Sequence, residues 1–411
     1  MTATTWQPIL LDELGERARA AIDRVAGDLG QLDPGTRPFG ASVAGGSSGF
    51  AVLFNELARR GHEGAAEIAM AHVDASMDAV AEEPMPPSLY AGFVAVAWMM
   101  SLLEGGVLPV SEDPPAAELE EVLLRFLERS PWPYEYDLVS GLVGFGVYAL
   151  RRRDDAFGKQ AIATLLLRLE EIAVRDGRTT AWFTPAPMLP EHQRREYPDG
   201  YFNAGLAHGI PGVIGLLGQV AAVEGNLMAT SLVDGAVRWL GAHRLAPGAP
   251  SRFPGTVSPD GTGKPSRLAW CYGDAGIAAA LHVAGSAMGR DDIVEEAVSA
   301  LRASAERPHE LAGVADAGLC HGAAGLAHIY NRFFQATGDE LFLREAIHWF
   351  NDALDRAVPG DPLGGFQGWT IDGFEPDPGL LTGSTGVALA LLAATADAPP
   401  EWDQLLLVSP V

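Results

Sequence analysis

A short glycine box recurs along this chain, and the recurrence restricts the folds that the chain can adopt. The box consists of two glycines three residues apart followed by an apolar run, with alanine replacing the second glycine in one copy. It occurs seven times at intervals of 46 to 68 residues, with first glycines at Gly46, Gly92, Gly141, Gly209, Gly273, Gly322 and Gly383. Self-similarity over such a distance indicates repeated supersecondary units.

Two kinds of helical pattern flank each box. The amphipathic segments that precede the boxes are residues 12–28, 63–81, 116–128, 159–175, 228–243, 291–306 and 340–356. Within them apolar residues recur at helical spacing, as Leu119, Val122 and Phe126 do between acidic residues. A more apolar helical segment follows each box, for example residues 213–223. Because no stretch alternates strictly enough to indicate a sheet, the pattern predicts an all-α fold of fourteen helices in seven hairpins.

The two helix types together predict an α/α toroid, with seven amphipathic helices in an outer ring and seven apolar helices in an inner ring. Glycine at the start of each inner helix allows backbones to approach closely and directs N–H groups toward the centre. We therefore expect one domain over residues 1–411, with the boxes at one end of a central cleft. Residues 179–201 contain four prolines and predict an inserted loop, either a lid or a solvated connector.

Composition and charge narrow the kinds of partner and the cellular compartment that we expect for this protein. The formal net charge is −25, from 28 basic and 53 acidic residues, which argues against nucleic acid or an anionic membrane surface as partner. The N-terminus has no basic start or apolar core, so we expect no signal peptide. The longest apolar run, residues 89–100, is too short to span a bilayer. With only two cysteines, these features predict a cytoplasmic protein with reduced thiols.

Both cysteines lie just before a box glycine, which indicates a metal site. Cys271 precedes one box, and Cys320 with His321 precedes the next. Two thiolates and one imidazole match a three-ligand zinc site with an open fourth position, which is the catalytic pattern. The alternative is a pair of buried apolar thiols or a disulfide. His208 holds nearly the same position before its own box, so we expect all four side chains at one end of the toroid.

Residues around these boxes resemble those of a known family. Trp270-Cys-Tyr-Gly273, Leu319-Cys-His-Gly-Ala-Ala-Gly325 and Gly205-Leu-Ala-His-Gly-Ile-Pro-Gly212 are similar to the signature boxes of lanthionine synthetase C-like (LanC-type) cyclases. The resemblance extends over essentially the whole chain, with Ala275 where the family usually has proline. It implies a toroid of seven inner and seven outer helices. It also implies closure of thioether rings in ribosomal peptides, by a free-standing enzyme without a dehydratase domain.

The resemblance also implies roles for individual residues. It places the zinc ligands at Cys271, Cys320 and His321. It places the catalytic residues at His208, Asp137, Arg267 and Tyr272. The remaining acids near the boxes, Asp274 and Asp316, are expected to cap helices or face solvent, and His328 is expected in the core.

These residue types suit addition of a thiol to a dehydro amino acid. Zinc at an open site would hold the substrate thiol as a thiolate. Attack at Cβ builds charge on a carbonyl oxygen, for which Arg267 is the natural cation. His208 has the intrinsic pKa of a general acid, and Asp137 could orient and charge it. Tyr272 could donate a hydrogen bond or act as an alternative acid.

The leading hypothesis is therefore a zinc-dependent enzyme that forms (methyl)lanthionine rings. Its partners would be a dehydrated precursor peptide carrying Cys and a separate dehydratase. One alternative adds a small thiol such as glutathione to dehydrated peptides. Another is a non-catalytic zinc scaffold that binds a dehydratase or leader peptide. A sugar-active toroid with paired carboxylates is a further alternative, but it leaves both cysteines unexplained.

Overall fold

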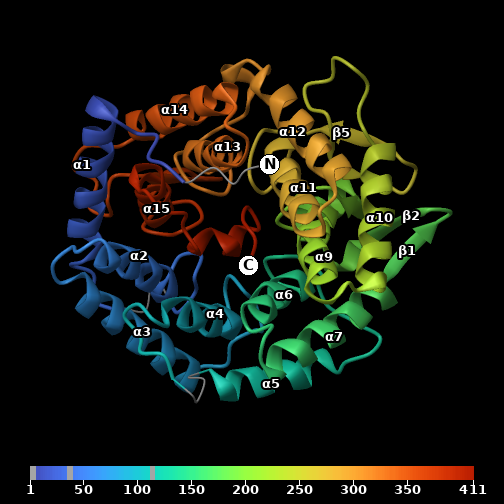
Figure 1. The fold of residues 1–411 in the computed structure, drawn as a ribbon, viewed down its shortest axis with the longest axis horizontal. Helices are drawn as coiled ribbons and strands as arrows, with labels where there is room; N and C mark the ends of the chain where they lie inside the picture. The colour runs from blue at the N-terminus through green and yellow to red at the C-terminus, as the bar shows by residue number, and fades with distance from the viewer. Residues whose placement is uncertain (1–5, 35–39, 112–115) are drawn as a thin grey trace. The chain divides into compact units, whose positions relative to one another are not determined.

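The computed structural model describes residues 6–34, 40–111 and 116–411, and it is mainly helical (Figure 1). These residues contain fifteen α-helices and seven short β-strands. The chain divides into two compact units. Unit 1 comprises Met1–Glu121 and Val314–Trp402, and unit 2 comprises Val122–Gly313 and Asp403–Val411. Among the described residues, no helix combines the length and apolar character needed to cross a membrane.

Unit 1 consists of two layers of helices. The apolar helices lie side by side in the order α13, α15, α2, α4, and the amphipathic helices α14, α1 and α3 pack against them (Figure 1). A two-stranded hairpin, β6 with β7, completes the unit. The elements are α1 (Asp12–Leu29), α2 (Ser47–Arg59), α3 (Ala65–Glu82), α4 (Phe93–Leu103), α13 (Ala323–Thr337), α14 (Glu340–Asp355), β6 (Gln367–Thr370), β7 (Gly373–Pro376) and α15 (Ser384–Thr395). The boundary between the units falls within α5 (Ala117–Leu127).

Unit 2 repeats this layering. The apolar helix α9 lies between α6 and α11, and the amphipathic helices α7, α10 and α12 pack on α6, α9 and α11 (Figure 1). The helices are α6 (Leu142–Arg151), α7 (Ala156–Glu171), α8 (Glu191–Glu196), α9 (Ile210–Glu224), α10 (Leu227–Ala242), α11 (Asp274–Met288) and α12 (Asp291–Ala305).

The helix prediction is confirmed in both units. The expected segment 228–243 forms α10 (Leu227–Ala242), and the first glycine of every box is the N-cap of an apolar helix. Fourteen of the fifteen helices have at least ten residues, which agrees with the number expected. Their arrangement as two rings of seven in a single domain stays a prediction.

The helix pairing differs in one respect from the expected hairpins. The amphipathic helix that packs on an apolar helix is the one that follows it in the chain, as α10 does on α9 and α12 on α11. The reason is loop length, because only two residues separate α9 from α10 and α11 from α12. Such short connections leave consecutive helices as antiparallel neighbours.

Close backbone approach explains the second glycine of the box. A Cβ atom on Gly276 would lie 2.0 Å from the carbonyl oxygen of Trp270, far inside van der Waals contact. The first glycine of this box is needed for a different reason. Gly273 has a φ of 99°, a backbone conformation that residues with a side chain rarely adopt. Glycine therefore allows the turn before the box to fold back onto the first turn of the helix.

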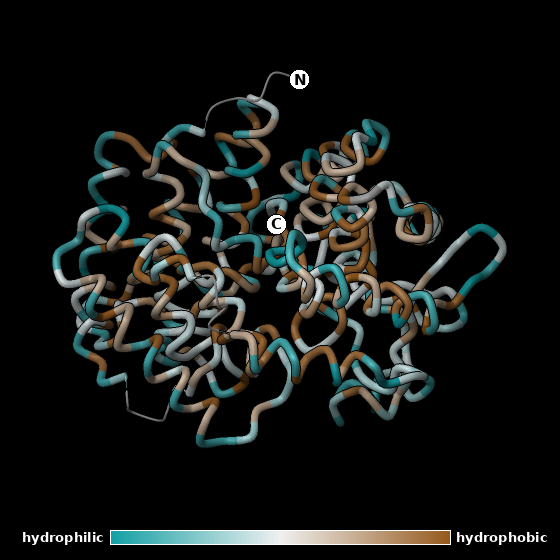
Figure 2. The backbone as a smooth tube through the Cα atoms, turned by 60° about the horizontal axis from the view of Figure 1, so that its bottom comes forward, coloured by the Kyte–Doolittle hydropathy of each residue, from teal (hydrophilic) through white to brown (hydrophobic). Residues whose placement is uncertain are grey.

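Short strands are the part of the fold that the sequence patterns did not predict. Five of them form an antiparallel sheet within unit 2, and the expected loop 179–201 supplies β2, α8 and the start of β3. The strands are β1 (Ala173–Asp176), β2 (Thr179–Thr184), β3 (Tyr201–Asn203), β4 (Pro254–Val257) and β5 (Gly263–Pro265). Strands of three to six residues are too short to show a clear alternation. The hairpin of β1 and β2 ends in a hydrophilic tip (Figure 2).

Candidate functional site

Backbone hydrogen bonds link the turns that precede the boxes of unit 2. The N–H of Leu138 donates to the carbonyl of Ala207 at 3.1 Å, and the N–H of Ala207 donates to the carbonyl of Cys271 at 3.3 Å. Three turns that are far apart in the sequence are thereby held next to one another. Asp137, His208 and Cys271 stand on these three turns.

The corresponding turns of unit 1 are linked in the same way. The N–H of Cys320 donates to the carbonyl of Leu381 at 2.7 Å, and the N–H of Leu380 donates to the carbonyl of Ala44 at 2.7 Å. The turn that carries Cys320 and His321 is thus held by its neighbour, ahead of the first turn of α13.

Asp137 and His208 form a close pair, which brings together two of the expected catalytic residues. His208 Nδ1 lies 2.5 Å from Asp137 Oδ2, and Asp137 Oδ1 accepts a hydrogen bond from the N–H of Ser140 at 2.7 Å. The Asp137 carboxylate is buried, whereas the side chain of His208 is 43% exposed. A fixed carboxylate therefore holds an imidazole whose other nitrogen remains available.

The environment of His208 raises its pKa above the usual value. Burial by itself lowers the pKa, but the hydrogen bond and charge of Asp137, with a further contribution from Cys271, outweigh it. The imidazole is therefore charged over a wider pH range than a solvated histidine. Protonated imidazole beside a carboxylate is the state that a general acid requires.

Tyr272 lies at the edge of the same group and is held by an amide. The side-chain amide of Asn203 donates to the Tyr272 hydroxyl at 2.9 Å, and Asn203 Oδ1 accepts from the N–H of Gly205 at 2.8 Å. Burial, followed by the nearby Tyr201 hydroxyl, raises the pKa of Tyr272, so the phenol stays protonated. Sequence reasoning missed Asn203 because an amide before a glycine turn is common and gave no distinct signal.

Arg267 is the expected catalytic residue that the structure constrains least. It is exposed, and it lies in the loop between β5 and α11, four residues before Cys271. Its carbonyl oxygen packs against Gly273, where a Cβ atom would approach it to 1.9 Å. The backbone at this position is therefore tightly packed, although the residue as a whole is exposed.

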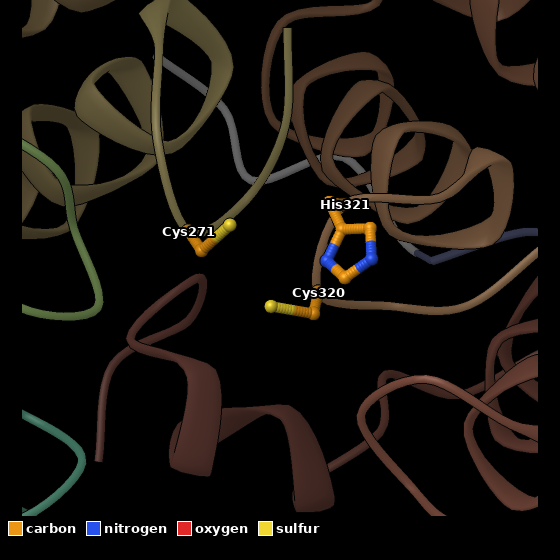
Figure 3. A group of neighbouring side chains, drawn as sticks. All are labelled: Cys271, Cys320 and His321. Atoms are coloured by element: carbon orange, nitrogen blue, oxygen red, sulfur yellow. The ribbon is translucent and has the colours of Figure 1, made fainter. Parts of the chain in front are cut away.

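Cys320 and His321 stand side by side on the turn before the box at the start of α13 in unit 1 (Figure 3). Cys271 lies two residues before Gly273, the box glycine at the start of α11 in unit 2. All three are residue types that bind zinc. Neither cysteine forms a disulfide, so the disulfide alternative does not apply.

Asp316 corrects one expectation from the sequence. Instead of capping a helix or facing solvent, its fully buried carboxylate lies 3.0 Å from His321 Nε2. The N–H of Gly318 donates to Asp316 Oδ1 at 2.9 Å, and the N–H of Trp369 in β6 approaches Oδ2 at 3.3 Å. Figure 3 shows the ring of His321 beside the side chain of Cys320. A carboxylate on the far nitrogen orients a ligand histidine and raises its basicity.

Asp274 is the other acid that the sequence analysis assigned to caps or solvent, and it too is buried. Its carboxylate accepts hydrogen bonds from the N–H groups of Arg252 and Phe253 at 2.8 and 2.9 Å. The loop before β4 is thereby attached to the start of α11. This is a structural role.

Fold and site together define a mainly helical protein in which turns before the glycine boxes carry a buried carboxylate paired with an imidazole. The chain matches the family described as lanthionine synthetase C-like protein over residues 37–407. Because this match covers most of the chain, the protein belongs to that family. The resemblance seen in the sequence is thereby confirmed.

Two relatives show how far the similarity extends. The chain is 25% identical over 211 residues to the nisin biosynthesis protein NisC of Lactococcus lactis subsp. lactis. This alignment covers 49% of the chain and 50% of NisC, so the match spans about half the length of that relative. The structure of nisin cyclase superposes with a TM-score of 0.75 over 95% of this chain and 97% of its own, at 19% identity.

A more distant structure shares the fold only in outline. A sugar epimerase from a ruminal bacterium superposes with a TM-score of 0.50 at 10% identity, covering 92% of this chain and 98% of its own. At such low identity, the structural likenesses establish a common fold and carry no information on activity.

Proposed function

We propose that this protein is a zinc-dependent cyclase that forms (methyl)lanthionine rings. It would add Cys thiols to dehydroalanine or dehydrobutyrine within a ribosomally made precursor peptide. The observation that carries the proposal is the Asp137–His208 pair on the turn adjoining that of Cys271, in a member of the lanthionine synthetase C-like family. A cytoplasmic location and a separate dehydratase that supplies the substrate belong to the same proposal.

The donor set of Cys271, Cys320 and His321 fits zinc in its chemistry. Two thiolates and an imidazole are preferred zinc ligands, and tetrahedral zinc holds such atoms roughly 3.5 to 3.8 Å apart. Asp316 behind His321 supplies the outer carboxylate that such sites commonly have. When bound by Cys271, Cys320 and His321, zinc would hold an incoming Cys thiol as its thiolate.

The protein side chains serve the second half of the reaction. A C–S bond forms at Cβ, the electrons of the C=C bond move to the carbonyl oxygen, and Cα then takes a proton. His208 is the proton donor, because its raised pKa keeps it charged and Asp137 fixes the ring. Arg267 is the cation for the enolate oxygen, and Tyr272 offers a protonated hydroxyl beside the pair. The peptide mass is unchanged overall, since the thiol proton lost is balanced by the proton gained.

The test is to incubate a dehydrated precursor containing Cys with the protein and then add a thiol-alkylating reagent. Cyclisation leaves the peptide mass unchanged and removes the alkylatable thiols. His208→Asn should retain zinc and lose roughly 10²- to 10⁴-fold in ring closure. His348→Asn, an exposed position on α14, is the matched control and should behave as wild type.

Three outcomes would contradict the proposal. If all Cys remain alkylatable while glutathione adds readily, the protein is a small-thiol transferase instead. If the peptide binds but neither reaction occurs, it is a non-catalytic scaffold. If His208→Asn closes rings at the wild-type rate, the assignment of the proton donor is wrong.

A further inference from the structure

A cavity of about 570 Å³ opens beside the Asp137–His208 pair, entirely within unit 2. Asp137, His208 and Tyr272 form one of its walls. These are the side chains to which we assign proton donation, so whatever occupies the cavity lies next to the reacting carbon. Cavities of roughly 300 to 1,000 Å³ accommodate small ligands or a few side chains.

Another part of the lining comes from the segment after β2, where Met188 and Leu189 contribute. The guanidinium group of Arg194 fixes this segment. It donates to the carbonyls of Ala186, Pro187 and Leu189 at 3.2, 3.3 and 2.9 Å. Three hydrogen bonds from one cation hold the wall in a defined shape, so the cavity is a formed feature of unit 2.

The lining favours apolar and aromatic side chains. Trp132, Tyr134 and Phe183 contribute aromatic surface. Among the described residues, the lining contains the acids Glu135 and Asp137 and no Lys or Arg side chain. The imidazole of His208 is paired with Asp137, so the carboxylate of Glu135 is the lining charge outside this pair. An apolar side chain would gain buried contact here, whereas an acidic one would meet like charge.

We propose that this cavity binds the side chain of the peptide residue adjacent to the dehydro amino acid and selects apolar over acidic residues there. The inference rests on the proposed cyclase function and identifies its substrate preference. The geometric reason is that neighbouring Cα atoms along a peptide are about 3.8 Å apart. A dehydro residue placed at His208 therefore directs its neighbour into the space beyond Tyr272.

The first experiment varies the substrate. Dehydrated precursors would carry Leu, Phe, Ala, Asp or Lys next to the dehydro residue, and kcat/KM for ring closure would be compared. Burial of one apolar side chain predicts that Leu and Phe exceed Asp by roughly 10- to 100-fold. A parallel binding series uses the same peptides with Ser in place of the dehydro residue, followed by fluorescence anisotropy. This series reports on the cavity without any chemistry.

The second experiment replaces a residue that lines the cavity. Met188→Lys places a cation in the cavity and should weaken binding of the Leu peptide while strengthening that of the Asp peptide. The matched control is Met228→Lys on α10, an exposed methionine outside the cavity, which should keep the wild-type preference. If Met188→Lys and Met228→Lys rank the peptides alike, the cavity proposal is overturned.

The two proposals fail in different ways. If the wild-type protein closes rings with no preference among the flanking residues, the cyclase function stands and the cavity proposal falls. If no peptide is cyclised, yet the unreactive peptides bind in the order Leu above Asp and Met188→Lys reverses that order, the cavity stands and the cyclase function falls.

Discussion

Replacing Asp137 by Asn should move the alkaline limb of the pH–rate profile to lower pH. His208 is active as an acid only below its pKa, so ring closure declines as the pH rises through that value. Asp137 is the main group that raises this pKa. The isosteric amide removes the negative charge and leaves burial, which lowers the pKa. The charged form of His208 is then lost at a lower pH than in the wild type.

The size of the shift follows from the geometry of the pair. A hydrogen bond to a charged partner contributes about 1.5 to 3 kcal/mol. Because the His208 side chain is 43% exposed, solvent screens the interaction, and the lower figure applies. At 1.36 kcal/mol per unit, the limb should move down by about one pKa unit. At pH values well above the alkaline limb, ring closure by the variant should therefore be about tenfold slower than by the wild type. Any misorientation of the His208 imidazole would add to this loss.

The assay is the initial rate of thiol loss from a dehydrated precursor, measured at constant ionic strength across the pH range. The matched control is Asp234→Asn on α10 in the same unit, where the carboxylate pairs with Arg290 at 2.8 Å. Both variants should contain as much zinc as wild type. If the alkaline limb of Asp137→Asn coincides with that of Asp234→Asn, His208 is not the acid whose pKa Asp137 sets.

Further predictions concern the metal site and the enolate. Purified protein should contain about one zinc per chain, and Cys320→Ala should abolish metal binding while circular dichroism remains helical, since the apolar helices pack without the site. Asp316→Asn should weaken zinc binding roughly 10- to 100-fold in a competition with a chelator, because His321 loses its orienting carboxylate. Unchanged affinity would assign Asp316 a purely structural role. Arg267→Lys should lower kcat at unchanged zinc content, as a point charge cannot replace the planar guanidinium; equal turnover would remove Arg267 from the mechanism.

The local pattern of the sequence was sufficient to predict the helices and their starts. Helical periodicity depends on residues within a few positions of each other. The predicted helical segment 291–306 therefore agrees closely with the observed helix α12 (Asp291–Ala305). Gly276 shows why the boxes carry information, because no side chain fits against the Trp270 carbonyl. Cys271, Cys320 and His321 stand just before box glycines and are residue types that bind zinc, so their role as metal ligands stays a prediction from the sequence.

Contacts between distant segments were decided only by the tertiary structure. Asp137 and His208 are 71 positions apart, and the role of the carboxylate depends on a 2.5 Å distance that no local pattern encodes. Asp316 looked like a helix cap until folding buried it against the far nitrogen of His321. β3 pairs with the distant strands β2 and β4, and residues of β2 and β3 line the cavity beside His208. Sequence periodicity determines which segments become helices, whereas only packing determines which side chains meet.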